Sequence, residues 1–261
     1  MRIGTVTLHG LSDQEISNLL PDNLILLGFR GSIAHEMYVP QDHPDSIDDK
    51  DIMGVYVGPK ELYIGFDRKE QKEKVHNEWD AVSYEIRKMC SLLEKGNPNV
   101  LSLLWLPDKH YIWKHALGAR LVLNRNLFAT RQVYHSFNGY AWGQFKRMTN
   151  YKFEGYMGQK RKELVDRYGY DCKNAAHLIR LLKMGIEFLS EGYLYVGRSD
   201  AEMLLSVKHG EWALDRVKTE AERLFRLAEE SYVKSKLPDR PDHKAVESLV
   251  MGIIEDFHLW S

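Results

Sequence analysis

The spacing of apolar residues changes near residue 111, and this change constrains the fold more than any other feature of the 261-residue sequence. Beyond it, apolar residues recur at intervals of three and four, the period of a helix that buries one face. This pattern runs through residues 133–148, 174–189 and 211–235. The second half of the chain is therefore predicted to be mainly helical, with residues 192–197 (GYLYVG) as a short strand or an extended connector.

The first third of the chain mixes helix and strand patterns. Residues 12–20 begin with Ser12 and carry Glu15 at the position of a helix capping box. Residues 79–96 begin extended and become an amphipathic helix that ends at Gly96. Three further segments have the composition of strands: 24–29 (LILLGF), 51–58 (DIMGVYVG) and 61–66 (ELYIGF).

These patterns predict an α/β (α+β) protein in two parts. Residues 1–110 are expected to form a mixed sheet with flanking helices, the catalytic domain. Residues 111–261 are expected to form a mainly helical domain that packs on the first and completes a substrate cleft. The sequence contains no repeat or flexible linker between them.

Composition limits the choice of partners and compartment. The 36 Lys and Arg residues nearly balance the 37 Asp and Glu residues, so the net charge of -1 gives no general attraction to nucleic acid or membrane. The first ten residues lack the apolar core of a signal peptide, and no run approaches the roughly 20 apolar residues that span a bilayer. Only two cysteines occur, without zinc spacing. We expect a cytoplasmic protein in a reducing compartment, with no membrane partner.

A short turn follows the predicted strand at residues 24–29. Arg30, Gly31 and Ser32 come directly after it. Glycine lets backbone N–H groups approach phosphate oxygens, and the serine hydroxyl adds a donor. Such a turn can hold a triphosphate, although a Gly-Ser pair after a strand is most often only a turn.

Two aspartates lie at the head of the next predicted strand. Asp49 and Asp51 flank Lys50, and the period of two along a strand points both carboxylates to one face. Carboxylate oxygens are the ligands that magnesium prefers, and a shared pair can support two ions in phosphoryl chemistry. The alternative interpretation is a solvated acidic loop, because three more aspartates lie nearby: Asp42, Asp45 and Asp48.

Together, GSIAH (residues 31–35) and DKD (residues 49–51) resemble the signature of the DNA polymerase β nucleotidyltransferase superfamily. More narrowly, the chain resembles the predicted nucleotidyltransferases of the RNA-repair-pathway polymerase-β-like group. Four further stretches carry this resemblance, so that it covers most of the chain: 84–105, 137–148, 169–189 and 201–212.

The resemblance implies a role for each matched residue. Gly31 and Ser32, with Arg30 beside them, are expected to bind the triphosphate, while Asp49 and Asp51 coordinate two Mg²⁺ ions. A third carboxylate normally completes the site, binds metal and assists deprotonation of the attacking hydroxyl. Asp80 and Glu85 are the candidates, and Asp80 is preferred because it begins the predicted strand. An acidic residue before a helix is also an ordinary cap or dipole partner.

Two departures from the family pattern stand out. The gap between Ser32 and Asp49 is longer than usual, so the loop with Pro40 and Pro44 must fold back, as a flap over substrate. In addition, Glu36 stands where related proteins have a small glycine. A bulky anion there is expected to weaken or reshape triphosphate binding.

One predicted helix carries a polar stripe. Lys173, His177 and Arg180 are spaced by four and three residues and therefore share one face. The resemblance favours contact between this face and the triphosphate or an RNA backbone. The alternatives are a buried histidine and two solvated charges. Arg87 and Lys88 face a similar choice, between neutralising phosphate and ending an exposed turn.

A run of basic and aromatic residues, 146–170, is the first candidate for RNA binding. Its pattern combines backbone contacts with base stacking, although half of its charges are expected to be ordinary surface groups. The residues concerned are Lys146, Arg147, Tyr151, Lys152, Phe153, Tyr156, Lys160, Arg161 and Lys162.

The predicted activity is transfer of a nucleoside monophosphate from a nucleoside triphosphate, ATP first, to a hydroxyl acceptor with release of pyrophosphate. An RNA 3′ end is the favoured acceptor. Two alternatives remain open: a weakly active or inactive nucleotide- or RNA-binding module, and an enzyme that nucleotidylates protein hydroxyls.

Overall fold

The computed structural model describes residue 8 and residues 10–40, 42–43, 46, 48–65, 71–76, 78–149 and 159–260. The chain forms two compact units. The first unit comprises Met1–Ala34, Asp49–Phe128 and Arg240–Ser261, and the second comprises His35–Asp48 and Ala129–Asp239. The chain thus leaves the first unit after Ala34 and returns to it at Asp49. The predicted division at residue 110, into a catalytic and a helical domain, stays a prediction.

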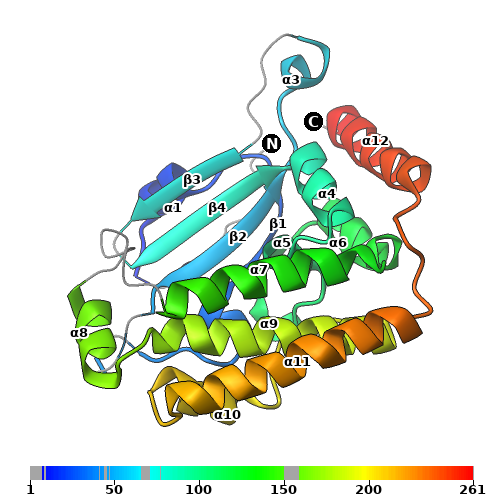
Figure 1. Ribbon diagram of the computed structural model, residues 1–261. Helices are drawn as coiled ribbons and strands as arrows, with labels where there is room; N and C mark the ends of the chain where they lie inside the picture. The colour runs from blue at the N-terminus through cyan, green and yellow to red at the C-terminus, as the bar shows by residue number, and fades with distance from the viewer. Residues whose placement is uncertain are drawn as a thin grey trace. The chain divides into compact units, whose positions relative to one another are not determined.

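The first unit is built on a five-stranded mixed sheet in the order β3-β4-β2-β1-β5. Figure 1 labels the first four strands of this order. Only β2 and β4 run parallel, and the other neighbours are antiparallel. The strands are β1 (Leu24–Phe29), β2 (Lys50–Tyr56), β3 (Gln71–His76), β4 (Trp79–Glu85) and β5 (Tyr111–Lys114).

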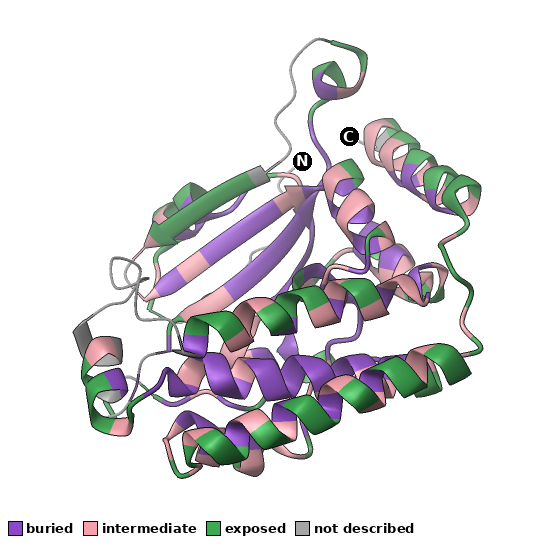
Figure 2. Ribbon diagram, viewed as in Figure 1, coloured by how far each residue is buried: buried purple, intermediate pink, exposed green. Residues whose placement is uncertain are grey.

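The central strands are apolar because both of their faces are covered. Residues 52–57 of β2 and its C-terminal neighbour are buried, whereas the edge strand β3 has the charged sequence QKEKVH and is exposed along most of its length (Figure 2). Lysines and glutamates on an edge strand discourage pairing with another chain. The apolar composition of the central strands and the charged composition of β3 therefore match their positions in the sheet.

Helices α1 to α6 and α12 belong to the first unit. Helix α1 has the predicted capping box, in which Ser12 and Glu15 bind each other's backbone N–H groups, and its Ile16 and Leu19 pack in the core with Leu27. The helices are α1 (Asp13–Leu19), α2 (Gly31–Ala34), α3 (Lys60–Ile64), α4 (Ile86–Glu94), α5 (Pro98–Leu104), α6 (Ala116–Leu123) and α12 (His243–Trp260), with 3-10 turns at Asp108–His110 and Arg125–Phe128.

The second unit is helical. Helix α9 is its centre and packs against α7, α10 and α11, which explains why most of its residues are buried. The helices are α7 (Gln132–Thr149), α8 (Gln159–Tyr168), α9 (Cys172–Glu191), α10 (Ala201–Lys208) and α11 (Leu214–Lys234).

The structure confirms the predicted α/β class, with a mixed sheet, flanking helices and a mainly helical later part. One element was predicted wrongly: residues 60–64 form helix α3, not a strand. The Tyr63 hydroxyl accepts a hydrogen bond from the Gly58 N–H at 2.9 Å and donates one to Glu85 at 3.0 Å, contacts that hold this short turn of helix. Strands β3 and β5 were not predicted, and residues 192–197 form a connector without strand pairing. Among the described residues, no helix is long and apolar enough to cross a membrane.

Candidate active site

Strand β1 ends where α2 begins, and the backbone there lies against the carboxylate of Asp51. The Arg30 N–H donates to the Asp51 carbonyl oxygen at 2.9 Å. Gly31 has φ +61°, and a Cβ atom at this position would collide with the Asp51 carboxylate. Both the backbone angle and the close approach require glycine. The Gly-Ser pair therefore brings bare main chain to an acidic side chain.

Asp51 and Asp80 lie side by side on the parallel strands β2 and β4. They are direct partners in the strand register, so their side chains lie on the same face of the sheet. Both are partly exposed, at 26% and 38% for the side chains. The Arg30 Nη2 atom lies 3.3 Å from Asp51 Oδ1 and 2.9 Å from Asp80 Oδ2. Oxygens of both carboxylates therefore lie within ion-pair reach of one positive group.

Lys50 is turned to the opposite face, as strand alternation requires. Its Nζ atom lies 2.5 Å from Glu78 Oε1 and 5.3 Å from the centre of the Trp79 ring. Asp49 is exposed and lies one residue before β2, and Ser32 in α2 is half-buried. Arg30, Gly31, Asp51 and Asp80 thus form one corner of the first unit, which we call the aspartate corner.

The donor chemistry of the aspartate corner fits a divalent cation. Carboxylate oxygens are hard ligands, and the two that face Arg30 already share one cationic neighbour. The described residues contain no group of three or more His, Cys, Asp or Glu side chains arranged to hold a metal. Asp49 is the nearest further carboxylate along the chain.

Glu85, the second candidate for the third carboxylate, lies at the far end of β4. Its register partner is Tyr56, five residues beyond the Asp51 pair, and it is completely buried. It accepts hydrogen bonds from the Tyr63 hydroxyl at 3.0 Å and from Arg87 Nε at 3.2 Å. Burial, and then the nearby Glu85 charge, raises the pKa of Tyr63. The geometry therefore favours Asp80 over Glu85 as a partner of Asp51, and it pairs Arg87 with Glu85.

The predicted polar stripe on α9 (Lys173, His177 and Arg180) belongs to the second unit. Basic side chains of this unit contact the segment His35–Asp48. Lys208 on α10 pairs with the buried Asp48 and donates to the Met37 carbonyl at 3.1 Å. Lys173 Nζ lies 3.6 Å from Asp48 Oδ1. Burial lowers the pKa of Lys208, and the Asp48 charge opposes this shift. Lys173 is thus part of a mostly buried ion cluster.

Arg180 is buried and contacts a histidine. Its Nη1 atom bonds His35 Nε2 and lies 3.3 Å from Met184 Sδ. Since His35 Nδ1 must donate to the Val196 carbonyl at 2.9 Å, Nε2 is the acceptor and the imidazole is neutral. Burial, and then the charge of Arg198, lowers the pKa of Arg180 to about 9, so it remains cationic at pH 7. No carboxylate pairs with Arg180 in the described part of the chain.

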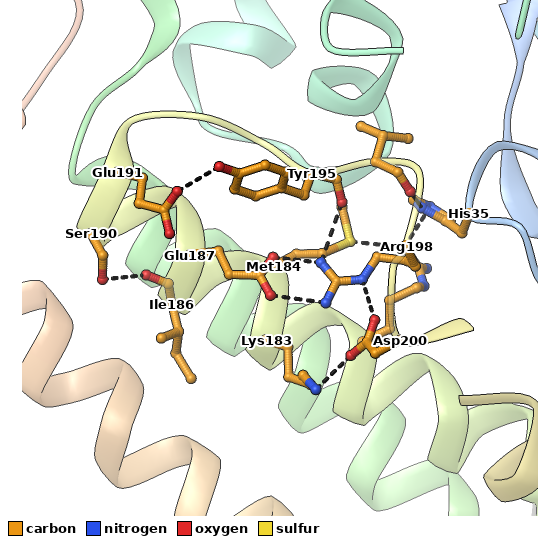
Figure 3. Close-up of polar contacts among 12 residues, drawn as sticks. His35, Lys183, Met184, Ile186, Glu187, Ser190, Glu191, Tyr195, Arg198 and Asp200 are labelled. Carbon is orange, nitrogen blue, oxygen red and sulfur yellow. Dashed lines mark hydrogen bonds and ion pairs between the residues drawn. The ribbon is translucent and has the colours of Figure 1, made fainter. Parts of the chain in front are cut away.

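Arg198, by contrast, is neutralised. It lies between Glu187 and Asp200, with Nη2 at 2.9 Å from Glu187 Oε1 and Nε at 2.8 Å from Asp200 Oδ1 (Figure 3). Lys183 also pairs with Asp200 at 2.5 Å. Arg198 therefore has carboxylate partners that balance its charge, whereas the buried Arg180 has none among the described residues. His177, the remaining member of the stripe, is half-buried.

Sequence reasoning missed the pairing of Lys208 with Asp48. These residues lie 160 positions apart, and charged side chains are mostly exposed, so nothing local marks either one as buried. Glu36 was singled out from the family pattern, and it is the one described non-glycine residue with positive φ, +59°. The glycine usual at this position in related proteins suits that backbone angle. Pro44 lies outside the described residues.

The basic and aromatic run is described only in part. Lys146 lies 5.6 Å from the centre of the exposed Trp142 ring, which stacks on Phe145, and Arg147 and Lys162 are also described. Tyr151, Lys152, Phe153 and Tyr156 lie outside the described residues, as do the side chains of Lys160 and Arg161.

A mixed sheet that sets two aspartates in register beside a Gly-Ser turn is the arrangement expected of a polymerase β-like nucleotidyltransferase. A family model described as RNA repair pathway DNA polymerase beta family matches residues 31–251. The chain therefore belongs to this family, which confirms the resemblance drawn from the sequence and makes it a polymerase β-like protein of RNA repair. No curated protein matches the chain.

Proposed function

We propose that this protein transfers a nucleoside monophosphate from a nucleoside triphosphate, ATP first, to the 3′ hydroxyl of an RNA. The observation that carries the proposal is the aspartate corner, where Asp51 and Asp80 stand in register next to the Gly31 backbone. Family membership supports nucleotidyl transfer and a place in RNA repair.

Each residue of the corner has a proposed role. Gly31 and Ser32 bind the β and γ phosphates through backbone N–H groups and the serine hydroxyl. Asp80 accepts the proton of the attacking hydroxyl, which lies in line with the departing pyrophosphate. Glu85 has no proposed catalytic role, because its carboxylate is buried among Tyr63 and Arg87.

Asp51 and Asp80, with Asp49 before the strand, are the proposed ligands of two Mg²⁺ ions. When bound, magnesium neutralises charge on the triphosphate and lowers the pKa of an attacking hydroxyl. Family members generally use divalent metals, and the paired carboxylates of the corner have the chemistry for it.

Lys173, His177 and Arg180 are proposed as a second contact for phosphate, on the triphosphate or on the RNA backbone. Arg180 gives this its main support, since no described carboxylate neutralises its charge. Lys173 shares Asp48 with Lys208 and is expected to contribute less.

The alternative is a binding module with little or no turnover. Glu36 favours it, because a non-glycine residue at φ +59° costs about 1–2 kcal/mol and adds a negative charge at a position where related proteins have glycine. On this account, Glu36→Gly would increase triphosphate binding and restore turnover. An enzyme that nucleotidylates protein is the third outcome to be tested.

The deciding experiment follows label from each α-labelled nucleoside triphosphate into cellular RNA or protein, in the presence of Mg²⁺. The variants are Asp51→Asn and Asp80→Asn. The matched control is Arg87→Gln, at the start of α4 next to the other end of β4, and all rates are compared per folded molecule. Transfer to RNA by wild type and Arg87→Gln, but by neither aspartate variant, supports the proposal, whereas the same pattern with label in protein identifies an enzyme that nucleotidylates protein. Equal transfer by all four proteins, or binding of triphosphate without transfer by wild type, contradicts it.

A further inference from the structure

Arg30 uses only part of its hydrogen-bonding capacity at the aspartate corner. One nitrogen, Nη2, contacts both Asp51 and Asp80. Its Nε atom is buried and has no hydrogen-bond partner among the described residues. A guanidinium has five N–H donors in a planar fork, an arrangement that suits phosphate oxygens as well as carboxylates. The side chain therefore has unused donor capacity, which a further acceptor can reach once the guanidinium moves.

The position of Arg30 also places it in competition with any cation that the two aspartates hold. A divalent ion bound by the two aspartates would lie close to the guanidinium, which contacts one oxygen of each, and the two positive charges repel each other at short range. Lys50 takes no part, since it is turned to Glu78 and Trp79 on the other face. Arg30 also directly precedes Gly31 and Ser32, the proposed triphosphate ligands.

We propose that Arg30 is a switch between the two functions of this corner. It holds Asp51 and Asp80 together until a divalent cation binds them, and then turns its guanidinium to an oxygen of the triphosphate. This inference rests on the proposed function. It assigns Arg30 two successive partners, first the aspartates and then the triphosphate, whereas the residue pattern alone suggested only nucleotide binding.

Such an exchange couples the two ligands. Cation binding releases Arg30, and the released Arg30 strengthens triphosphate binding. Because coupling between binding sites is reciprocal, the triphosphate must strengthen cation binding through Arg30 by the same factor. Removing the side chain therefore has opposite effects on the two ligands: the cation alone binds more tightly, and the triphosphate binds less tightly.

Mn²⁺ provides the first measurement, because electron paramagnetic resonance counts the free ion. An adjacent opposite charge shifts a carboxylate's proton affinity by roughly 1–3 pKa units, so loss of Arg30 should have a comparable effect on a cation. We expect Arg30→Gln to bind Mn²⁺ about tenfold more tightly than wild type. Arg30→Lys, which keeps the charge, should stay close to wild type, and the control Arg87→Gln should match wild type.

Inorganic tripolyphosphate provides the second measurement, by calorimetry with Mn²⁺ in excess, so that the aspartates of every variant already hold the cation before the phosphate binds. Loss of a charge-assisted hydrogen bond should weaken its binding to Arg30→Gln about tenfold. Opposite signs for the two ligands cannot arise from a simple loss of folding, which would weaken both. An unchanged or weaker affinity of Arg30→Gln for Mn²⁺, or an unchanged affinity for the tripolyphosphate complex, overturns the switch.

Asp51→Asn separates this inference from the proposed function. If Asp51→Asn weakens Mn²⁺ binding and Arg30→Gln leaves it unchanged, the metal site stands and the switch is wrong. If Asp51→Asn leaves Mn²⁺ binding as it is in wild type, the aspartates are not metal ligands. The proposed function then fails, and the switch fails with it.

Discussion

The two ends of the β2–β4 strand pair carry the same chemical groups in different surroundings. At one end, Arg30 pairs with Asp51 and Asp80, and all three side chains are between 26% and 38% exposed. At the other end, Arg87 pairs with Glu85, whose carboxylate is completely buried and also bonded to Tyr63. Both ends combine an arginine with acidic side chains. Only one of them leaves its carboxylates open to a ligand.

The difference teaches how to tell a site from a structural ion pair. A buried carboxylate with its acceptor sites used by a hydroxyl and a guanidinium holds its neighbours in place, and removal of such a group costs stability. Two partly exposed carboxylates that share one cation, one of them against the Gly31 backbone, gain little stability from their pairing. They are available for binding, and the expected effects of substitution follow from this contrast.

The largest expected effect is on catalysis. Asp80→Asn should lower the rate of nucleotidyl transfer by about a thousandfold, because charged groups preorganised for the transition state commonly contribute that much. Glu85→Gln should keep the rate per folded molecule within a few-fold of wild type. Single-turnover rates of α-labelled nucleotide transfer measure both. A comparable loss in the two variants would remove the functional contrast between the ends.

The next effect is on stability and runs the other way. Glu85→Gln should lower the free energy of unfolding by about 2 kcal/mol, less than a fully buried pair would lose, because Arg87 is 43% exposed. Denaturant unfolding measures the change. A loss below about 0.5 kcal/mol, the range of ordinary surface substitutions, would show that the buried end is not a structural anchor.

Gly31→Ala tests whether the open end depends on bare backbone. The substitution places a residue at φ +61° and drives its Cβ into the Asp51 carboxylate, so we expect a loss of about 1–2 kcal/mol in unfolding free energy, with reduced transfer. Gly10→Ala is the control, because Gly10 has φ +84° and open space around it. If both variants lose transfer equally, the close approach to Asp51 is not what matters.

The smallest expected effect is that of Asp80→Asn on the free energy of unfolding. Asp80→Asn, the variant with the largest expected loss of transfer, is expected to change the unfolding free energy by less than about 1 kcal/mol in either direction, as partly exposed ion pairs do. The same denaturant titration used for Glu85→Gln measures it. A destabilisation as large as that of Glu85→Gln would indicate that the corner is a structural pair as well.

Much of this arrangement could be predicted from the sequence because local chemistry encodes it. The capping box of α1, the apolar run of β1 and the three-four spacing of α9 each require only neighbouring residues. The preference for Asp80 over Glu85 rested on its place at the start of a strand, and the register with Asp51 supports it. The charged edge strand β3 has no apolar alternation to mark it, since its partner β4 supplies the pairing.

Interactions between distant residues could not be predicted in the same way. The segment ELYI alternates as a strand does, yet contacts from Tyr63 to Gly58 and to Glu85 favour a turn of helix. Likewise, the face shared by Lys173, His177 and Arg180 was correct as helical geometry. The contacts of Lys173 with Asp48 and of Arg180 with His35 depend on residues more than a hundred positions away.

The charge of the aspartate corner depends on the register of β2, because Lys50 and Asp51 are consecutive residues that face opposite sides of the sheet. Because consecutive side chains alternate across a sheet, a slip of β2 by one residue could exchange Asp51 for Lys50, and the aspartate corner would lose a carboxylate and gain a cation. Strands β2 and β4 are parallel, so no hairpin turn fixes their alignment. Lys50 contacts Glu78 and Trp79 on the face opposite the aspartate corner. These contacts therefore help to keep β2 in the register that places Asp51, not Lys50, at the corner. An engineer who wished to invert the ligand preference of this scaffold would begin with a single-residue insertion or deletion before β2.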